Sequence, residues 1–252
     1  MNFALWWNRV ISQIRKWLTT SPPTILTMAA GSPESTATES KPVAGISNNL
    51  LRAAMGKAAP RAPQEAIAGL LALPPDNPAL ASPARAAALI GQAAHESSGF
   101  TRIVENLDYF AKRLTQVFPR RFPTLAKAEP FARNPQALAN NVYGGRLGND
   151  KLDDGWLYRG RGYLQLTGRE NYRILGRLLG LDLEGEPNLA TDPKIAWLIA
   201  SKFLATRTKG GKTALEWADE GNVEMVTRIV NGGTHGLDER LRLTALAGSA
   251  LV

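Results

Sequence analysis

Two glutamates, nine residues apart, could perform acid–base chemistry. Glu96 stands near the end of an alanine-rich stretch, and Glu105 follows in the segment TRIVENLDY. The carbonyl end of a helix and the neighbouring Phe100 should both disfavour a charged carboxylate at Glu96, which could then act as a general acid. If the chain turns back after this helix, the two carboxylates can face each other across a cleft, as in inverting glycosidases, whose carboxyl groups lie about 6.5–9.5 Å apart. The plainer alternatives are an exposed helix glutamate and a helix-start carboxylate.

A metal-dependent reaction finds little support in the residue types. His95-Glu96 could begin a zinc peptidase motif, but the position of its second histidine is occupied by Gly99. The chain has two histidines, the other being His235, and no cysteine. The lack of cysteine excludes thiolate catalysis, disulfides, zinc fingers and iron–sulfur clusters. We therefore expect neither a metal site nor a cofactor.

A second polar group of residues lies in and after the glycine-rich segment 160–168. If a strand forms there, Gln165 and Thr167 point to the same side. Amide and hydroxyl groups of this kind, continued by Asn171 and Tyr172, could bind the N-acetyl and hydroxyl groups of a sugar. The same segment could suggest phosphate or nucleic-acid binding. However, RGRG lacks a following Lys-Ser/Thr and occurs once rather than in a tract.

Helices must carry most of these residues. Ser82-Pro83 is typical of a helix start, with serine as the N-cap and proline in the first position, and the helix should end near Gly99. Residues 140–168 are rich in glycine with interleaved tyrosine and tryptophan, and we expect loops and short strands that line a cleft. Further helices are expected after Asp108, from Pro193, and through Val223, Val226, Ile229 and Val230, the last closed by Asn231-Gly232-Gly233.

The first 45 residues differ from the rest. In residues 1–18 the apolar side chains, including three tryptophans, recur at helical spacing within an arc of roughly 140°, opposite basic and polar side chains. Such a helix could lie on an anionic membrane or dock on a partner protein through residues 3–18. Its periodic pattern fits a secretory signal poorly, so we expect cytoplasmic synthesis without a clear signal peptide. Residues 19–45 are typical of a flexible linker, and a catalytic domain is expected over 46–252.

Composition and charge narrow the function classes. Hydrophobic residues make up 44% of the 252 residues and charged residues 21%, which excludes a disordered chain, a collagen and a coiled-coil rod. The net charge of +8 favours an anionic partner such as nucleic acid, a membrane or an acidic cell-wall polymer, although many basic proteins are merely soluble. Lysine and arginine are scattered among carboxylates, which argues against a nucleic-acid partner.

Five ordered segments resemble glycoside hydrolase family 19, the chitinase-like family, and above all its bacteriophage and bacterial endolysin branch. They are HESSGF, VENLDY, VYGGRLGN, YRGRGYLQLTGRENY and IVNGGTHGLDER. The resemblance implies a mainly α, α+β lysozyme-like fold, with a two-lobed helical domain and a small β element at a central cleft. It implies Glu96 as general acid and Glu105 as general base. It also implies substrate-binding roles for Tyr143, Arg161, Gln165, Thr167, Asn171, Tyr172, Asn231 and Arg240.

The chain departs from the plant chitinase pattern. It lacks the disulfide cysteines, and the segments between the two glutamates and after Asn231 are short, with Thr234-His235 where chitinases tend to have a carboxylate. Short loops suggest an open cleft that suits a branched peptidoglycan strand better than chitin. We expect a monomeric endolysin- or muramidase-type glycosidase that cuts β-1,4 bonds of peptidoglycan strands at the bacterial cell wall or periplasm. The alternatives are a chitinase and a non-catalytic glycan-binding protein on the same fold.

Overall fold

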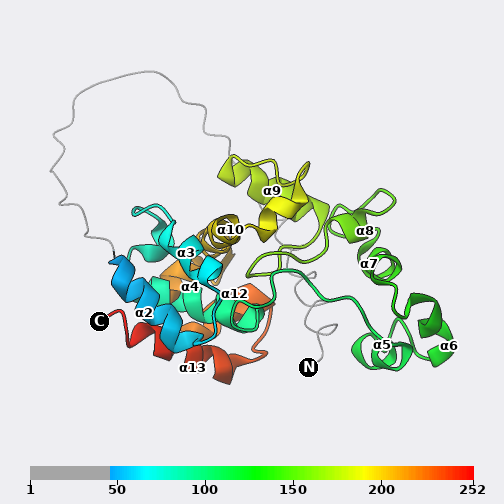
Figure 1. The fold of residues 1–252 in the computed structure, drawn as a ribbon, viewed down its shortest axis with the longest axis horizontal. Coiled ribbons are helices and arrows are strands. Elements are labelled where there is room, and N and C mark those ends of the chain that lie inside the picture. The colour runs from blue at the N-terminus through cyan, green and yellow to red at the C-terminus, as the bar shows by residue number, and fades with distance from the viewer. Residues whose placement is uncertain (1–45) are drawn as a thin grey trace, which may run out of the picture.

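The computed structural model describes residues 46–252, so the predictions of an amphipathic helix and a linker in residues 1–45 lie outside the described residues. The described chain is mainly helical, and its helices form two lobes (Figure 1). The first lobe contains α2 (Asn48–Ala58), α3 (Gln64–Leu71), α4 (Pro83–Glu96), α10 (Pro193–Thr206), α11 (Ala214–Asp219), α12 (Val223–Asn231) and α13 (Leu237–Gly248). The second contains α5 (Ala111–Val117), α6 (Leu125–Ala128), α7 (Pro135–Tyr143) and α8 (Asp154–Leu157), and α9 (Arg169–Leu179) lies beyond them in the chain.

Helix α4 is the central element of the first lobe. The Ser82 hydroxyl accepts a hydrogen bond from the Arg85 amide at 3.2 Å, which confirms the predicted helix start. The helix ends at Glu96, slightly before the predicted end, because the next residues turn the chain sharply. Ser98, Gly99 and Phe100 all have positive φ angles, and the Ser97 hydroxyl accepts from the amide of Phe100 at 2.9 Å. This turn leads the chain directly from Glu96 towards Glu105.

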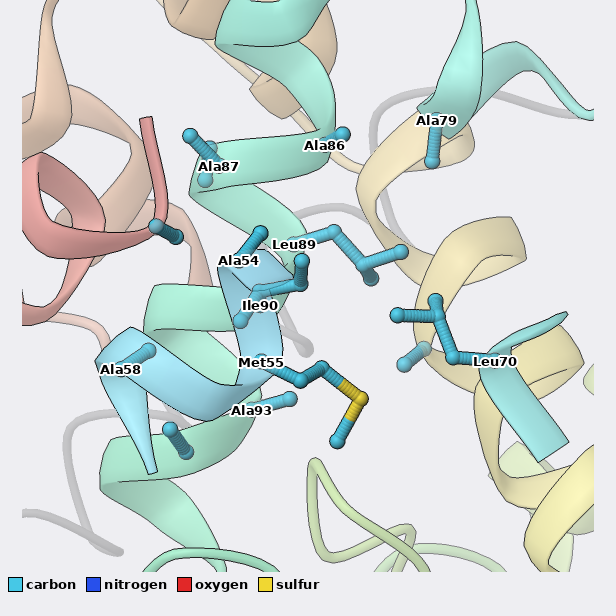
Figure 2. Close-up of a cluster of buried hydrophobic side chains, with 14 of the residues drawn as sticks. Ala54, Met55, Ala58, Leu70, Ala79, Ala86, Ala87, Leu89, Ile90 and Ala93 are labelled. Carbon is cyan, nitrogen blue, oxygen red and sulfur yellow. The ribbon is translucent and has the colours of Figure 1, made fainter. Parts of the chain in front are cut away.

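The core of the first lobe is built around the small residues of α4. Figure 2 shows Met55 of α2, Leu70 of α3 and Leu89 and Ile90 of α4 among the buried apolar side chains. Each of these large side chains contributes about 1.5–3 kcal/mol when it is fully buried. The alanines between them allow α2 and α13 to pack closely on α4. The lobe therefore holds the end of α4 rigidly.

The contact between α4 and α13 gives a test of this packing. Gly91 of α4 faces Thr244 of α13 so closely that an added Cβ would lie 2.8 Å from the Thr244 amide nitrogen. We expect Gly91→Ala to lower the free energy of unfolding in urea by about 1–3 kcal/mol. Gly56→Ala is the matched control, because a Cβ there has no neighbour within 4 Å and α2 should gain about 0.5–1 kcal/mol. A neutral Gly91→Ala would show that this contact is not tight.

The helices predicted from their termini are confirmed. In α10 the Asp192 carboxylate accepts from the Ile195 amide at 3.0 Å, and α12 is capped by Gly232, whose φ of 74° is left-handed. The second lobe has its own aromatic cluster, which includes Phe118, Phe122 and Tyr143. Within residues 46–252, no helix is both long and apolar enough to cross a membrane.

The small β element is present as expected, but its position in the chain differs from the prediction. The sheet is a pair of antiparallel two-residue strands, β1 (Thr208–Lys209) and β2 (Lys212–Thr213), which follow α10 and do not line the cleft described below. Residues 163–166 do not form a strand. They make a tight turn closed by an isolated β-bridge between Arg161 and Leu166, because Gly162 and Gln165 adopt positive φ angles that reverse the chain. A second bridge joins Arg161 to Val104, the residue before Glu105.

Candidate active site

Both predicted glutamates line one cleft of about 930 Å³. Its walls come from the end of α4, the segment that links α4 to α5, the start of α13 and the loop after α2. Gln165 from the glycine-rich turn and Arg240 from α13 also line it. The fold therefore brings together four of the ten residues predicted for the site.

Glu96 lies at the base of a buried polar network. One of its carboxylate oxygens accepts a hydrogen bond from the Arg240 guanidinium, which is 1% exposed. Arg240 also donates to Gln92 and, at 3.2 Å, to the backbone oxygen of His235. The prediction for Glu96 considered only the helix end and Phe100, and it did not include the positive charge of Arg240. The Glu96 carboxylate is therefore held by this guanidinium as well as by its place on α4.

Asn231 supports this network from behind. Its side-chain amide donates to the His235 carbonyl at 2.8 Å and accepts from the Gly233 amide at 2.7 Å. The residue is buried and does not line the cleft. The structure therefore places Asn231 as a support for the turn that receives Arg240, rather than against substrate or a catalytic water.

Glu105 lies in different surroundings. One carboxylate oxygen accepts from the Tyr143 hydroxyl and the other from the Gly160 amide at 3.3 Å. Burial raises the pKa of Glu105 to about 7, although both hydrogen bonds and the charge of Arg159 act in the opposite direction. Burial and the neighbouring Glu105 charge raise the pKa of Tyr143 well above its ordinary value, so its hydroxyl remains a donor.

Gly160 lies close to both Gln165 and Glu105, and a side chain at this position would displace Gln165. An added Cβ would lie 2.8 Å from the Gln165 side-chain oxygen and 3.2 Å from the Cβ of Glu105. The close approach lets the backbone of Gly160 exchange hydrogen bonds with Glu105. Gln165 is held beside it by a 2.9 Å bond from its amide to the Gly162 carbonyl. The glycine-rich segment therefore positions the second glutamate.

Several predicted sugar contacts are instead structural supports. Thr167, Asn171 and Tyr172 are buried and are not among the residues that line this cleft. Their polar groups bond to protein backbone: Thr167 donates to Gln165 at 2.9 Å, Asn171 to Thr167 at 2.8 Å, and Tyr172 to Arg159 at 2.9 Å.

Arg161 and Tyr143 also lie behind the cleft surface. Arg161 is 2% exposed and donates to the Leu157 carbonyl at 2.7 Å and to the Tyr172 hydroxyl at 3.1 Å. Tyr143 is buried and reaches the site through its bond to Glu105. Neither residue lines the cleft as a substrate contact. Tyr143 can act on the reaction by positioning Glu105.

Sequence reasoning missed other residues of the cleft. His95 Nδ1 lies 3.0 Å from a carboxylate oxygen of Glu239, and burial is the main cause that lowers the pKa of His95. The His95–Glu239 pair lies next to the Glu96–Arg240 pair, because His95 and Glu96 are consecutive in α4 and Glu239 and Arg240 are consecutive in α13. The sequence predicts this arrangement only once the end of α4 and the start of α13 are known to meet. The lining also includes Tyr109 and the four arginines Arg61, Arg102, Arg113 and Arg242.

This arrangement suits proton transfer by two carboxylates. One is ion-paired at the end of α4, and the other is half-buried with a pKa near neutrality. Within residues 46–252, no group of three or more His, Asp or Glu side chains is arranged to hold a metal ion.

The comparisons with known proteins agree with this chemistry. No family model matches the chain. A glycosyl hydrolase family 19 domain-containing protein of Haemophilus influenzae is 40% identical over 162 residues, which cover 62% of this chain and 75% of that protein. Rice chitinase 8 is 37% identical over 92 residues, covering 30% of this chain and 35% of that protein.

Solved structures share the fold. Chitinase C from Streptomyces griseus superposes with a TM-score of 0.54 at 18% identity, over 81% of this chain and 93% of the chitinase. Another bacterial family 19 chitinase gives a TM-score of 0.51 at 22% identity, over 79% of this chain and 95% of that one. The mainly α architecture is thus that of known family 19 enzymes. Together with the identity to the Haemophilus protein, this shows that the chain belongs to glycosyl hydrolase family 19 and is a glycoside hydrolase.

Proposed function

We propose that this enzyme hydrolyses β-1,4 bonds of peptidoglycan at the bacterial cell wall, in the service of cell lysis. The observation that carries the proposal is that Glu96 and Glu105 line one cleft in different surroundings. Glycoside hydrolysis by inversion needs an acid that protonates the leaving oxygen and a base that activates a water on the opposite face of the sugar. We assign the first role to Glu96 and the second to Glu105.

The surroundings of each glutamate support its role. Arg240 fixes the Glu96 carboxyl group at the end of α4, where a glycosidic oxygen could reach it. Tyr143 and the Gly160 amide fix the Glu105 carboxylate, whose remaining lone pairs can accept a proton from water. At and above neutral pH a large fraction of Glu105 is ionised, as a general base must be.

The charge of the cleft favours peptidoglycan over chitin. Four exposed arginines line it, whereas chitin is a neutral polymer that offers them no anionic group. The eight residues between the two glutamates form a tight turn rather than a long covering loop, which leaves room for a branched strand. Chitin is the second candidate, supported by the names of rice chitinase 8 and Streptomyces chitinase C.

The test is digestion of purified peptidoglycan by the wild-type enzyme, with Glu96→Gln as the catalytic blank and mass spectrometry of the fragments. New reducing ends that are absent from the blank are expected, and the terminal sugar will distinguish a muramidase from a glucosaminidase. Cleavage of chitin oligomers with peptidoglycan left intact would replace the proposal by a chitinase. Failure on both polymers would replace it by a glycan-binding protein.

A further inference from the structure

Four exposed arginines on the cleft wall have no ion-pair partner within the described residues 46–252. Among residues 46–252, ion pairs form at several sites, yet none involves Arg61, Arg102, Arg113 or Arg242. All four side chains are exposed and line the cleft that contains Glu96 and Glu105. We propose that Arg61 and Arg242 bind carboxylates of the stem peptides, so that the enzyme prefers peptide-bearing strands. This inference rests on the proposed function.

Arg61 and Arg242 lie on the wall formed by the first lobe. Arg61 follows α2, Arg242 is on α13, and these two helices pack against each other. Their neighbours in the cleft lining include the uncharged Ala58, Pro60 and Leu243. This part of the wall therefore presents two guanidinium groups with apolar side chains beside them.

The nearest acidic residue along α13 does not neutralise Arg242. Glu239 stands one turn before it, at a spacing that allows a helical ion pair. Its carboxylate instead lies 3.0 Å from His95. Arg240, the next residue, is buried against Glu96. The helix therefore uses one arginine to hold the catalytic glutamate and leaves the other available to a ligand.

A carboxylate is the ligand that fits these groups. Guanidinium binds carboxylate through two parallel hydrogen bonds, which a neutral sugar hydroxyl cannot match in strength. In peptidoglycan, peptides extend from every second sugar and carry free carboxylates away from the glycan chain. Arg61 and Arg242 line the wall of the cleft, whereas it is Arg240 that pairs with Glu96, and this position suits recognition of a branch rather than of the scissile bond.

The test compares two forms of the same glycan strands, one with its stem peptides and one from which an amidase has removed them. The double variant Arg61→Ala/Arg242→Ala is expected to lose about tenfold in kcat/KM on peptide-bearing strands, mainly through KM. On stripped strands, which keep only the lactyl carboxylate beside the sugar, the loss should be twofold or less. Added salt should reduce the wild-type preference for peptide-bearing strands, because the contacts are exposed.

Arg52→Ala/Arg120→Ala is the matched control, since it removes two exposed positive charges that do not line the cleft. This control should keep the wild-type preference. Arg61→Lys/Arg242→Lys should recover part of the loss, because the charge returns without the fork geometry. An equal loss on both forms of the strand, or no loss on either, would overturn the stem-peptide assignment while leaving the proposed function intact. A wild-type enzyme that cleaves neither form would overturn both.

Discussion

Glu96→Gln is expected to lower kcat on peptidoglycan by about 10²–10⁴-fold while the protein remains folded. Glutamine has no proton to give to the leaving oxygen, so the departing sugar would have to leave as an alkoxide. Its side-chain oxygen can still accept the hydrogen bond that Arg240 donates to Glu96. The measurement is the initial rate of reducing-end release, with circular dichroism and a urea titration of the same samples.

Glu96→Ala separates the catalytic from the structural role of this carboxyl group. It leaves Arg240, which is 1% exposed, without its anionic partner. Breaking a buried pair in this way costs about 3–5 kcal/mol, so the urea midpoint should fall well below that of Glu96→Gln. Glu65→Gln, on the exposed first turn of α3, is the control for neutralising a glutamate and should change neither property. A Glu96→Gln enzyme with wild-type kcat would exclude Glu96 as the acid.

Local sequence signals predicted the helices because their termini are encoded by neighbouring residues. Ser82-Pro83 and Asp192-Pro193 each supply a side-chain cap and a preorganised first turn, and both helices begin there. The glycine-rich segment gave a weaker signal, since its turn depends on the positive φ of Gln165, an angle that a non-glycine residue rarely adopts. Alternation of side chains was therefore a poor guide to which residues of that segment face the cleft.

The sequence predicted the site residues whose type the chemistry requires. It did not predict which of the other polar residues face the cleft and which are buried behind it. Glu96 and Glu105 line the cleft, but Tyr172 is fully buried and bonds to the backbone of Arg159. A polar residue in a sugar-binding motif can contact substrate or support the fold, and only the packing in the structure distinguishes these two roles. The pairing of His95 with Glu239 was also hidden, because it joins two helix ends that are far apart in the sequence.

The pH profile of kcat/KM is expected to rise through a limb centred near pH 7. Burial raises the pKa of Glu105 to about 7, and a general base must lose its proton before it can activate water. The enzyme should therefore be slower at pH 5 than at pH 7. A limb that falls through pH 7 would instead show that Glu105 acts as the acid and would reverse the two assignments.

Tyr143→Phe tests which contact sets this limb. The hydrogen bond from Tyr143 lowers the pKa of Glu105, so its removal should move the limb to higher pH and depress the rate most at acidic pH. Much of the rate of this variant should return once the pH exceeds the new pKa of Glu105. If Tyr143 instead contacted substrate directly, raising the pH would not restore the rate. Tyr163→Phe, which removes a hydroxyl within the first-lobe core, should leave the limb in place.

The stability of the folded protein offers a second measurement of the same group. The pKa of Glu105 is near 7 when folded and near its ordinary value of 4.5 when unfolded, so between these values the folded state binds more protons. The contribution of Glu105 to the free energy of unfolding is therefore at its maximum below pH 4.5 and is lost as the pH rises through 7. Glu105→Gln should remove this dependence, because a neutral amide does not titrate. If the wild-type and Glu105→Gln proteins showed the same pH dependence of stability over this range, the elevated pKa would be wrong, and the rising limb would need another source.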